Sequence, residues 1–118
     1  MASGILGQSA PSATTDTSVY TVPASTLAVV NVMVINRSAS NTADVRIALA
    51  ASGTPTAAEY IEYDVTVPPK GVIDRTGMAL QASKQVVVYT STADTSVTVT
   101  GLEPVSYTHL TLPTSVTV

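Results

Sequence analysis

The stretch Thr26-Leu-Ala-Val-Val-Asn-Val-Met-Val-Ile-Asn36 decides the fold class, because nearly every residue in it is apolar and most are β-branched. In a strand, successive side chains project to opposite faces. One face would then carry Leu27, Val29, Met33 and Ile35, and the other Ala28, Val30, Val32 and Val34. Because both faces are apolar, the pattern predicts a central strand that is covered on both sides. A buried helix is the alternative, but the β-branched residues and the turn-rich flanks favour a strand.

Six further stretches have the alternation or β-branched content of strands and are bounded by turn residues: 17–22, 44–50, 60–67, 72–80, 85–90 and 96–100. Short strands at intervals of about ten residues are typical of a β-sandwich or a jelly roll. The sequence therefore predicts an all-β chain, with a single sandwich or jelly-roll-like domain of about seven antiparallel strands. Stretch 17–22 ends at Pro23 and is expected at a sheet edge. Residues 57–59 are expected to add one helical turn.

The ends of the chain differ from this domain, which we assign to residues 17–103. Residues 1–16 are rich in Gly, Ser, Ala and Thr, which predicts a flexible, extended N-terminal arm. Its short apolar pair, Ile5 and Leu6, lies between two glycines. Insertion of this pair into a neighbouring subunit is one interpretation, and a mobile terminus is the other.

Residues 104–118 form a tail of different character. Residues 105–114, Val-Ser-Tyr-Thr-His-Leu-Thr-Leu-Pro-Thr, resemble one reading frame of a translated sequencing-library adapter. We therefore interpret residues 105–118 as non-native, with the natural sequence reaching about Glu103 or continuing in a part that was lost; a genuine final strand is the alternative. The interpretation matters for chemistry because His109 is the single histidine.

Composition argues against several classes of function. Charged residues make up 11% of the chain and the five basic residues are scattered, so no basic patch is available for nucleic acid. Cysteine is absent, which excludes disulfides and thiolate metal sites. No apolar run has the length of a membrane span, and the first residues lack the pattern of a secretory signal. We expect a protein that stays in the cytoplasm or in a particle assembled there, without a cofactor.

The residues give little sign of catalysis. Without cysteine, and with His109 discounted, no Ser-His or Cys-His nucleophile pair can be assembled. The acidic residues cluster at Glu59, Glu62 and Asp64. Simple alternation places Tyr60, Glu62 and Asp64 on one face and Ile61 and Tyr63 on the other.

Two carboxylates on one face suit a hard cation such as calcium, or acid and base roles on a sugar. We favour the plainer interpretation, which is a solvated face or a contact between subunits through Arg37, Arg46 or Arg75. The triplet Asn36-Arg37-Ser38 fits the glycosylation pattern. We interpret it as a chance match in a turn.

Several short motifs, taken in order, carry a resemblance to a known family. They are the opening Met-Ala-Ser-Gly-Ile-Leu-Gly-Gln, Val-Tyr-Thr-Val-Pro at 19–23, Asn-Arg-Ser at 36–38, Ala-Glu-Tyr-Ile-Glu-Tyr-Asp at 58–64, Asp-Arg-Thr-Gly at 74–77 and Val-Val-Tyr at 87–89. Together they resemble small virion structural proteins of tailed phages, in particular marine and cyanobacterial myovirus-like phages. The resemblance implies a β-domain of a capsid, tail or fibre, present in many copies and without catalytic residues.

The expected function is therefore that of a non-enzymatic virion structural or decoration protein, assembled in the host cytoplasm and located in the virion. Its expected partners are further copies of itself and other virion proteins, held by β-edge pairing and by arm exchange. The residues proposed for this interaction surface are Ile5, Leu6, Tyr60, Glu62 and Asp64. The alternative is a carbohydrate-binding or adhesin module that uses Tyr60 on a glycan. An enzyme that uses Glu62 and Asp64 is a third hypothesis.

Overall fold

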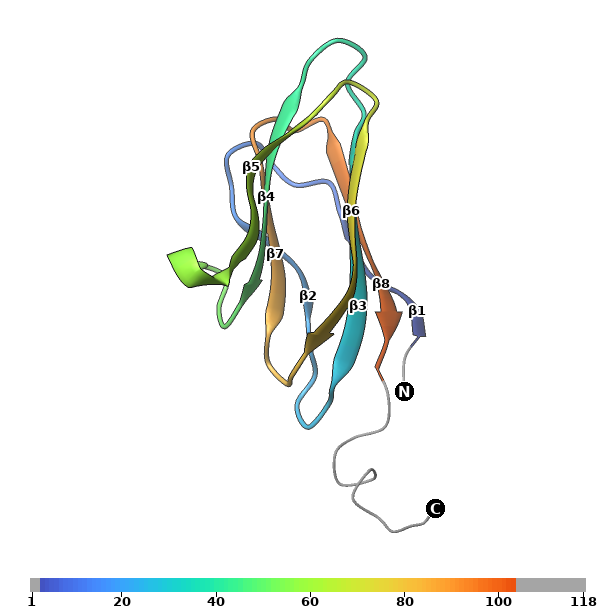
Figure 1. Cartoon of the computed structure of the whole chain (residues 1–118), viewed down its shortest axis with the longest axis vertical. Helices are drawn as coiled ribbons and strands as arrows, with labels where there is room; N and C mark the ends of the chain where they lie inside the picture. Colours follow the sequence, from blue (N-terminus) through green and yellow to red (C-terminus); the bar gives the residue numbers. More distant parts are fainter. Residues whose placement is uncertain (1–2, 104–118) are drawn as a thin grey trace.

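The computed structural model describes residues 3–103, in which the chain forms eight strands and one 3₁₀ turn. In chain order these are β1 (Ser3–Ser9), β2 (Thr17–Thr21), β3 (Ala28–Asn36), β4 (Ala43–Ala50), η1 (Ala57–Glu59), β5 (Tyr60–Val67), β6 (Val72–Leu80), β7 (Gln85–Thr90) and β8 (Thr95–Leu102). The strands form two four-stranded sheets that lie as two layers, with η1 projecting from one of them (Figure 1).

The strand order gives the fold. Sheet A has the order β1-β8-β3-β6 and sheet B the order β2-β7-β4-β5, and all neighbours are antiparallel. The first strand therefore pairs with the last, the second with the seventh, the third with the sixth and the fourth with the fifth. This nested pairing is one long hairpin rolled into two sheets, which is the strand order of a jelly roll. The predicted all-β sandwich is confirmed.

The strand boundaries expected from alternation agree closely with the structure. The predicted stretches 60–67, 72–80 and 85–90 coincide with β5, β6 and β7. Strand β2 lies at the edge of sheet B, as Pro23 indicated, and η1 is the expected helical turn.

The prediction of a flexible arm over residues 1–16 is wrong for Ser3–Ser9, which form edge strand β1 against β8. Strand β1 comes close to Val19 of β2 at Gly7, where a side chain would not fit. A Cβ added to Gly7 would lie 2.3 Å from the carbonyl oxygen of Val19. Strand β1 can thus lie against β2 of the other sheet. The adapter-like tail and His109 lie outside the described residues.

The core fills the space between the sheets. On the inner side of β3, Ala28, Val30, Val32 and Val34 are fully buried. Together with buried valines of β4, β7 and β8 and with Ile47, they form one apolar cluster to which both sheets contribute. Tyr20 is the one aromatic residue among the buried members of this cluster.

The outer side of β3 corrects the prediction that this strand is covered on both faces. Strand β3 is indeed internal to sheet A, between β8 and β6, but Val29 and Met33 are 37% and 41% exposed. Residues 3–103 form two layers, and no element among them covers the outer face of sheet A (Figure 1). One face of the most apolar strand therefore remains open.

Irregular pairing is confined to the edges of the sheets. The inner pairs β3–β8 and β4–β7 run in continuous register. Each of the four edge strands instead carries an extra residue relative to its inner neighbour: β1, β2 and β6 have one such bulge and β5 has two. Bulges twist an edge and hinder the addition of a further strand.

Candidate functional site

Strand β5 separates the acidic residues that simple alternation placed together. Tyr60 pairs with Ala48 on the outer side of sheet B, while Glu62 pairs with Ile47 of the core. Asp64 lies in the second bulge, opposite Arg46, with a positive φ of 53°. The prediction that Tyr60, Glu62 and Asp64 share a face is therefore wrong for Glu62, which the two bulges turn to the core side, while Tyr60 and Asp64 both lie on the outer side.

Each of the three clustered carboxylates has a partner within the chain. Glu62 forms an ion pair with Arg75 of β6, and an Asp64 oxygen lies 2.6 Å from Nε of Arg46. Glu59 accepts hydrogen bonds from the backbone N–H groups of Thr56 and Ala51, which lower its pKa. Residues 3–103 hold no group of three acidic or histidine side chains that suits a metal ion. Arg46 and Arg75, which were expected at a solvated face or in a contact between subunits, instead pair with Asp64 and Glu62 inside the chain, and the Glu62 side chain is only 14% exposed.

The outer face of sheet B carries a compact group that we call the tyrosine–arginine cluster: Arg46, Tyr60, Tyr63, Asp64 and Tyr89. The rings of Tyr60 and Tyr63 meet edge to face with their centroids 5.0 Å apart. The Arg46 guanidinium carbon lies 4.2 Å from the ring centroid of Tyr63 and 4.3 Å from that of Tyr89. The hydrogen bond from Arg46 to Asp64 raises the pKa of the Arg46 guanidinium above its ordinary value. The cluster presents aromatic surface next to a balanced ion pair.

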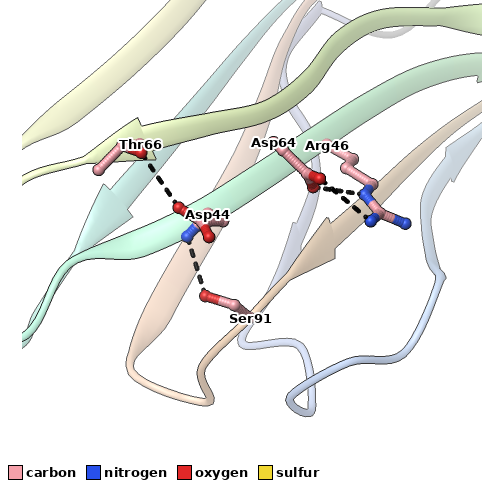
Figure 2. A network of polar contacts seen from close by, with 5 residues as sticks. All are labelled: Asp44, Arg46, Asp64, Thr66 and Ser91. Atoms are coloured by element: carbon pink, nitrogen blue, oxygen red, sulfur yellow. Dashed lines mark hydrogen bonds and ion pairs between the residues drawn. The ribbon is translucent and has the colours of Figure 1, made fainter.

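Polar contacts fix the strands that carry this cluster (Figure 2). Arg46 donates to Asp64 through both Nε and Nη2, across from β4 to β5. Two residues before Arg46 on β4, the carboxylate of Asp44 accepts a hydrogen bond from the Thr66 hydroxyl at 3.1 Å. The backbone N–H of Asp44 donates to the Ser91 hydroxyl at 2.9 Å. Two neighbours thus hold β4 in place on its outer side.

The outer face of sheet A has a different chemistry. Five large apolar side chains project from it, each between 37% and 63% exposed, and we call this surface the apolar face: Ile5, Val29, Met33, Val72 and Leu102. The strands of sheet A contain two charged residues, Asp74 and Arg75. Arg75 turns toward Glu62 of the other sheet, so Asp74 is the one charge that the described strands of sheet A place on this face.

A hollow of about 270 Å³ lies in the middle of the apolar face and is lined by Asn31, Val32, Met33, Asp74, Thr76, Thr98 and Thr100. It lies at the bulge of β6, where two residues oppose Asn31. The Asn31 side-chain oxygen accepts the backbone N–H of Gly77 at 3.0 Å, and Gly77 has a φ of +70°. The asparagine holds the bulge, and with it the hollow.

The predicted interaction residues have different environments. Ile5 is exposed on the apolar face, but Leu6 packs against the core of its own chain. Tyr60 belongs to the tyrosine–arginine cluster, and Glu62 and Asp64 belong to ion pairs. Sequence reasoning missed the bulge asparagine; its signal is that Asn31 is the one polar residue inside the apolar run 27–35.

The glycosylation match is a structural asparagine. Asn36 is buried, and its amide nitrogen donates to the backbone carbonyls of Asn41, Val67 and Pro68. Its side-chain oxygen accepts the backbone N–H of Ser38. The side chain is therefore fully used inside the fold.

No family model, curated protein or solved structure matches this chain. Among residues 3–103, no helix has the length and apolar character needed to cross a membrane.

Proposed function

We propose that this chain is a non-enzymatic structural protein of a tailed-phage virion, a component of the capsid, tail or fibre that assembles with further copies of itself. The motif resemblance points to this class, and the jelly-roll strand order suits it, since that order recurs in viral capsid domains and in lectins. A fold alone does not determine a function. The proposal therefore depends on a surface that suits assembly.

The single observation that carries the proposal is the apolar face. Isolated exposed apolar residues are ordinary, but a group of them on one side of one sheet is typical of an interaction surface. Complete burial of one such side chain contributes roughly 1.5–3 kcal/mol, so burying the exposed part of five contributes several kcal/mol. The edge pairing expected from the sequence is less suitable, because every edge strand is bulged and bulged edges hinder strand addition.

The solution mass of the full chain tests this proposal. We expect a discrete oligomer by light scattering behind a sizing column, and closed or tubular assemblies by electron microscopy at high concentration. Val72→Asp should reduce the mass, because it puts a charge on the apolar face. Ser18→Asp is the matched control, since Ser18 is exposed on the other sheet. A parent chain that stays monomeric at every concentration contradicts the proposal.

A specific observation favours carbohydrate binding as the second candidate. The bulges of β5 bring Tyr60 and Tyr63 to the same side, although alternation separates them. Tyr63 is 57% exposed, which leaves ring surface for a sugar beside the Arg46–Asp64 pair. A glycan array probed with the full chain tests this candidate: binding that Tyr63→Ala abolishes supports it, and an array without signal contradicts it.

A further inference from the structure

We propose that two copies of the chain pack face to face through the apolar face, related by a two-fold axis that runs along β3. This inference rests on the proposed function as an assembling subunit, and it names the surface, the partner and the symmetry of the contact. The partner is a second copy of the same chain.

The whole outer side of sheet A, which carries the apolar face, is large enough for a dimer. Nine residues of β3 span about 30 Å, and the four strands of sheet A are about 19 Å wide. Each copy therefore offers a flat area on the order of 570 Å², and two copies bury about 1,100 Å² in total. The uneven surface of the side chains adds to this area. Specific interfaces begin at about 1,000 Å² in total. A contact that used only part of this face would fall below that limit.

Charge makes the face compatible with itself in one orientation. Asp74 pairs with Met33 in register, and Met33 pairs with Thr98 on its other side. An axis across the strands at this level would bring Asp74 against Asp74 of the second copy. An axis along β3 instead exchanges the two flanks of the sheet, so that Asp74 of each copy faces Thr98 of the other. The hydroxyl can then donate to the carboxylate, which avoids a buried unpaired charge.

The shape of the face suits the same axis. Met33 lies near the middle of β3, beside the hollow. Rotation about β3 brings Met33 of the second copy opposite Met33 of the first, which is one of the residues that line this hollow. Methionine is flexible and fills irregular gaps well, so the hollow is filled without a change in the backbone. The packing is that of two aligned sheets about 10 Å apart.

Cross-linking at single positions tests the surface, because the chain has no cysteine and each introduced thiol reports only its own place. Met33→Cys in the full chain should form a covalent dimer with a bis-maleimide whose reach is about one inter-sheet spacing, about 10 Å. Ser18→Cys, exposed on sheet B, is the matched control and should stay uncoupled at the same protein concentration. Equal cross-linking of both variants, or none at Met33→Cys, overturns the proposed surface.

Charge at position 98 tests the axis. Thr98→Asp places a second carboxylate opposite Asp74 and should weaken dimerisation at least tenfold in dilution series by light scattering. Thr98→Lys places a cation there and should preserve or strengthen the dimer. Equal dissociation constants for Thr98→Asp and the parent overturn the axis along β3.

The two experiments also separate this inference from the function on which it rests. An oligomer that persists while Met33→Cys stays uncoupled overturns the face-to-face contact and keeps the assembling subunit. A parent chain that is monomeric at all concentrations overturns both.

Discussion

The Glu62 carboxylate on β5 and the Arg75 guanidinium on β6 form an ion pair that connects the edge strands of the two sheets. Bulges bring both residues to this position. Arg75 is in register with Val32, and Glu62 with Ile47, so both side chains start on the core side of their strands. The pair thus spans the side of the sandwich where β5 and β6 form the edges (Figure 1). On the opposite side, β1 and β2 approach each other through Gly7.

Replacement of Arg75 should destabilise the fold through Glu62. The Glu62 side chain is only 14% exposed, so Arg75→Ala leaves a poorly solvated carboxylate without its partner. We expect the free energy of unfolding to fall by about 1 kcal/mol, near the low end for a lost charged contact because Arg75 itself is well exposed. Urea denaturation followed by circular dichroism measures the change.

A double variant serves as the control for this pair. Glu62→Gln combined with Arg75→Ala removes the unpaired charge and should regain part of the lost stability. If Arg75→Ala alone is as stable as the parent, the Glu62–Arg75 pair contributes nothing to the free energy of unfolding.

The two faces of β3 should respond very differently to the same substitution. Val32 is fully buried, so Val32→Asp places an unpaired charge in the core and should leave the chain unfolded at 25 °C, since the cost approaches the whole stability of a small domain. Met33→Asp, one residue along, changes the open face and should keep the native circular dichroism spectrum. Comparable spectra for the two variants contradict the orientation of β3.

Periodicity predicted most of the fold because strand positions are a local property of sequence. The alternation in 60–67 and the turn residues around it suffice to define β5. Strand β1 was missed because its glycines weaken the strand signal. Gly7 is required by the close approach of Val19, a contact between strands that no local pattern reveals.

The candidate sites were harder to predict because they depend on bulges. An extra residue on β5 shifts Tyr60 and Glu62 to opposite sides of sheet B, and alternation cannot locate such a shift without the partner strand. The bulge of β6 has a local signal in the sequence, since Asn31 interrupts an apolar run and residue 77, whose φ is positive in the structure, is a glycine. The outer face of sheet A is uncovered because the described strands form only two layers. The residue pattern of one strand does not reveal the number of layers.

Glycine is required at position 101, where β8 passes close to β3. A Cβ added to Gly101 would lie 2.0 Å from the carbonyl oxygen of Val29, and the φ of Gly101 is 152°. Gly101→Ala should lower the free energy of unfolding by about 2 kcal/mol or more, because the backbone of an inner strand must shift. Gly53→Ala has nothing within 4 Å of the new Cβ and should leave the urea midpoint nearly unchanged. Equal midpoints for the two variants contradict the close approach.

The last described residues connect the end of sheet A to sheet B. The Tyr20 hydroxyl donates a hydrogen bond to the Glu103 carboxylate, 83 positions away in sequence. Because we interpret residues 105–118 as non-native, a chain ending at residue 104 should melt at the same temperature as the full chain. A chain ending at residue 102 loses Glu103 and should melt about 4 °C lower or more, which scanning calorimetry measures. A large loss of stability already at residue 104 contradicts the adapter interpretation.

The same contact predicts an alkaline loss of stability. Burial raises the pKa of Tyr20 above its ordinary value of 10.0, and the hydrogen bond to Glu103 and the charge of that carboxylate raise it further. Above pH 10 the folded chain therefore binds more protons than the unfolded chain, and the free energy of unfolding falls as the pH rises. Tyr20→Phe removes this contribution, so its stability should fall less between pH 9 and 11 in urea titrations. Tyr60, whose pKa burial also raises, keeps part of the slope in both chains, and identical slopes would show that Tyr20 ionises as freely in the folded chain as in the unfolded one.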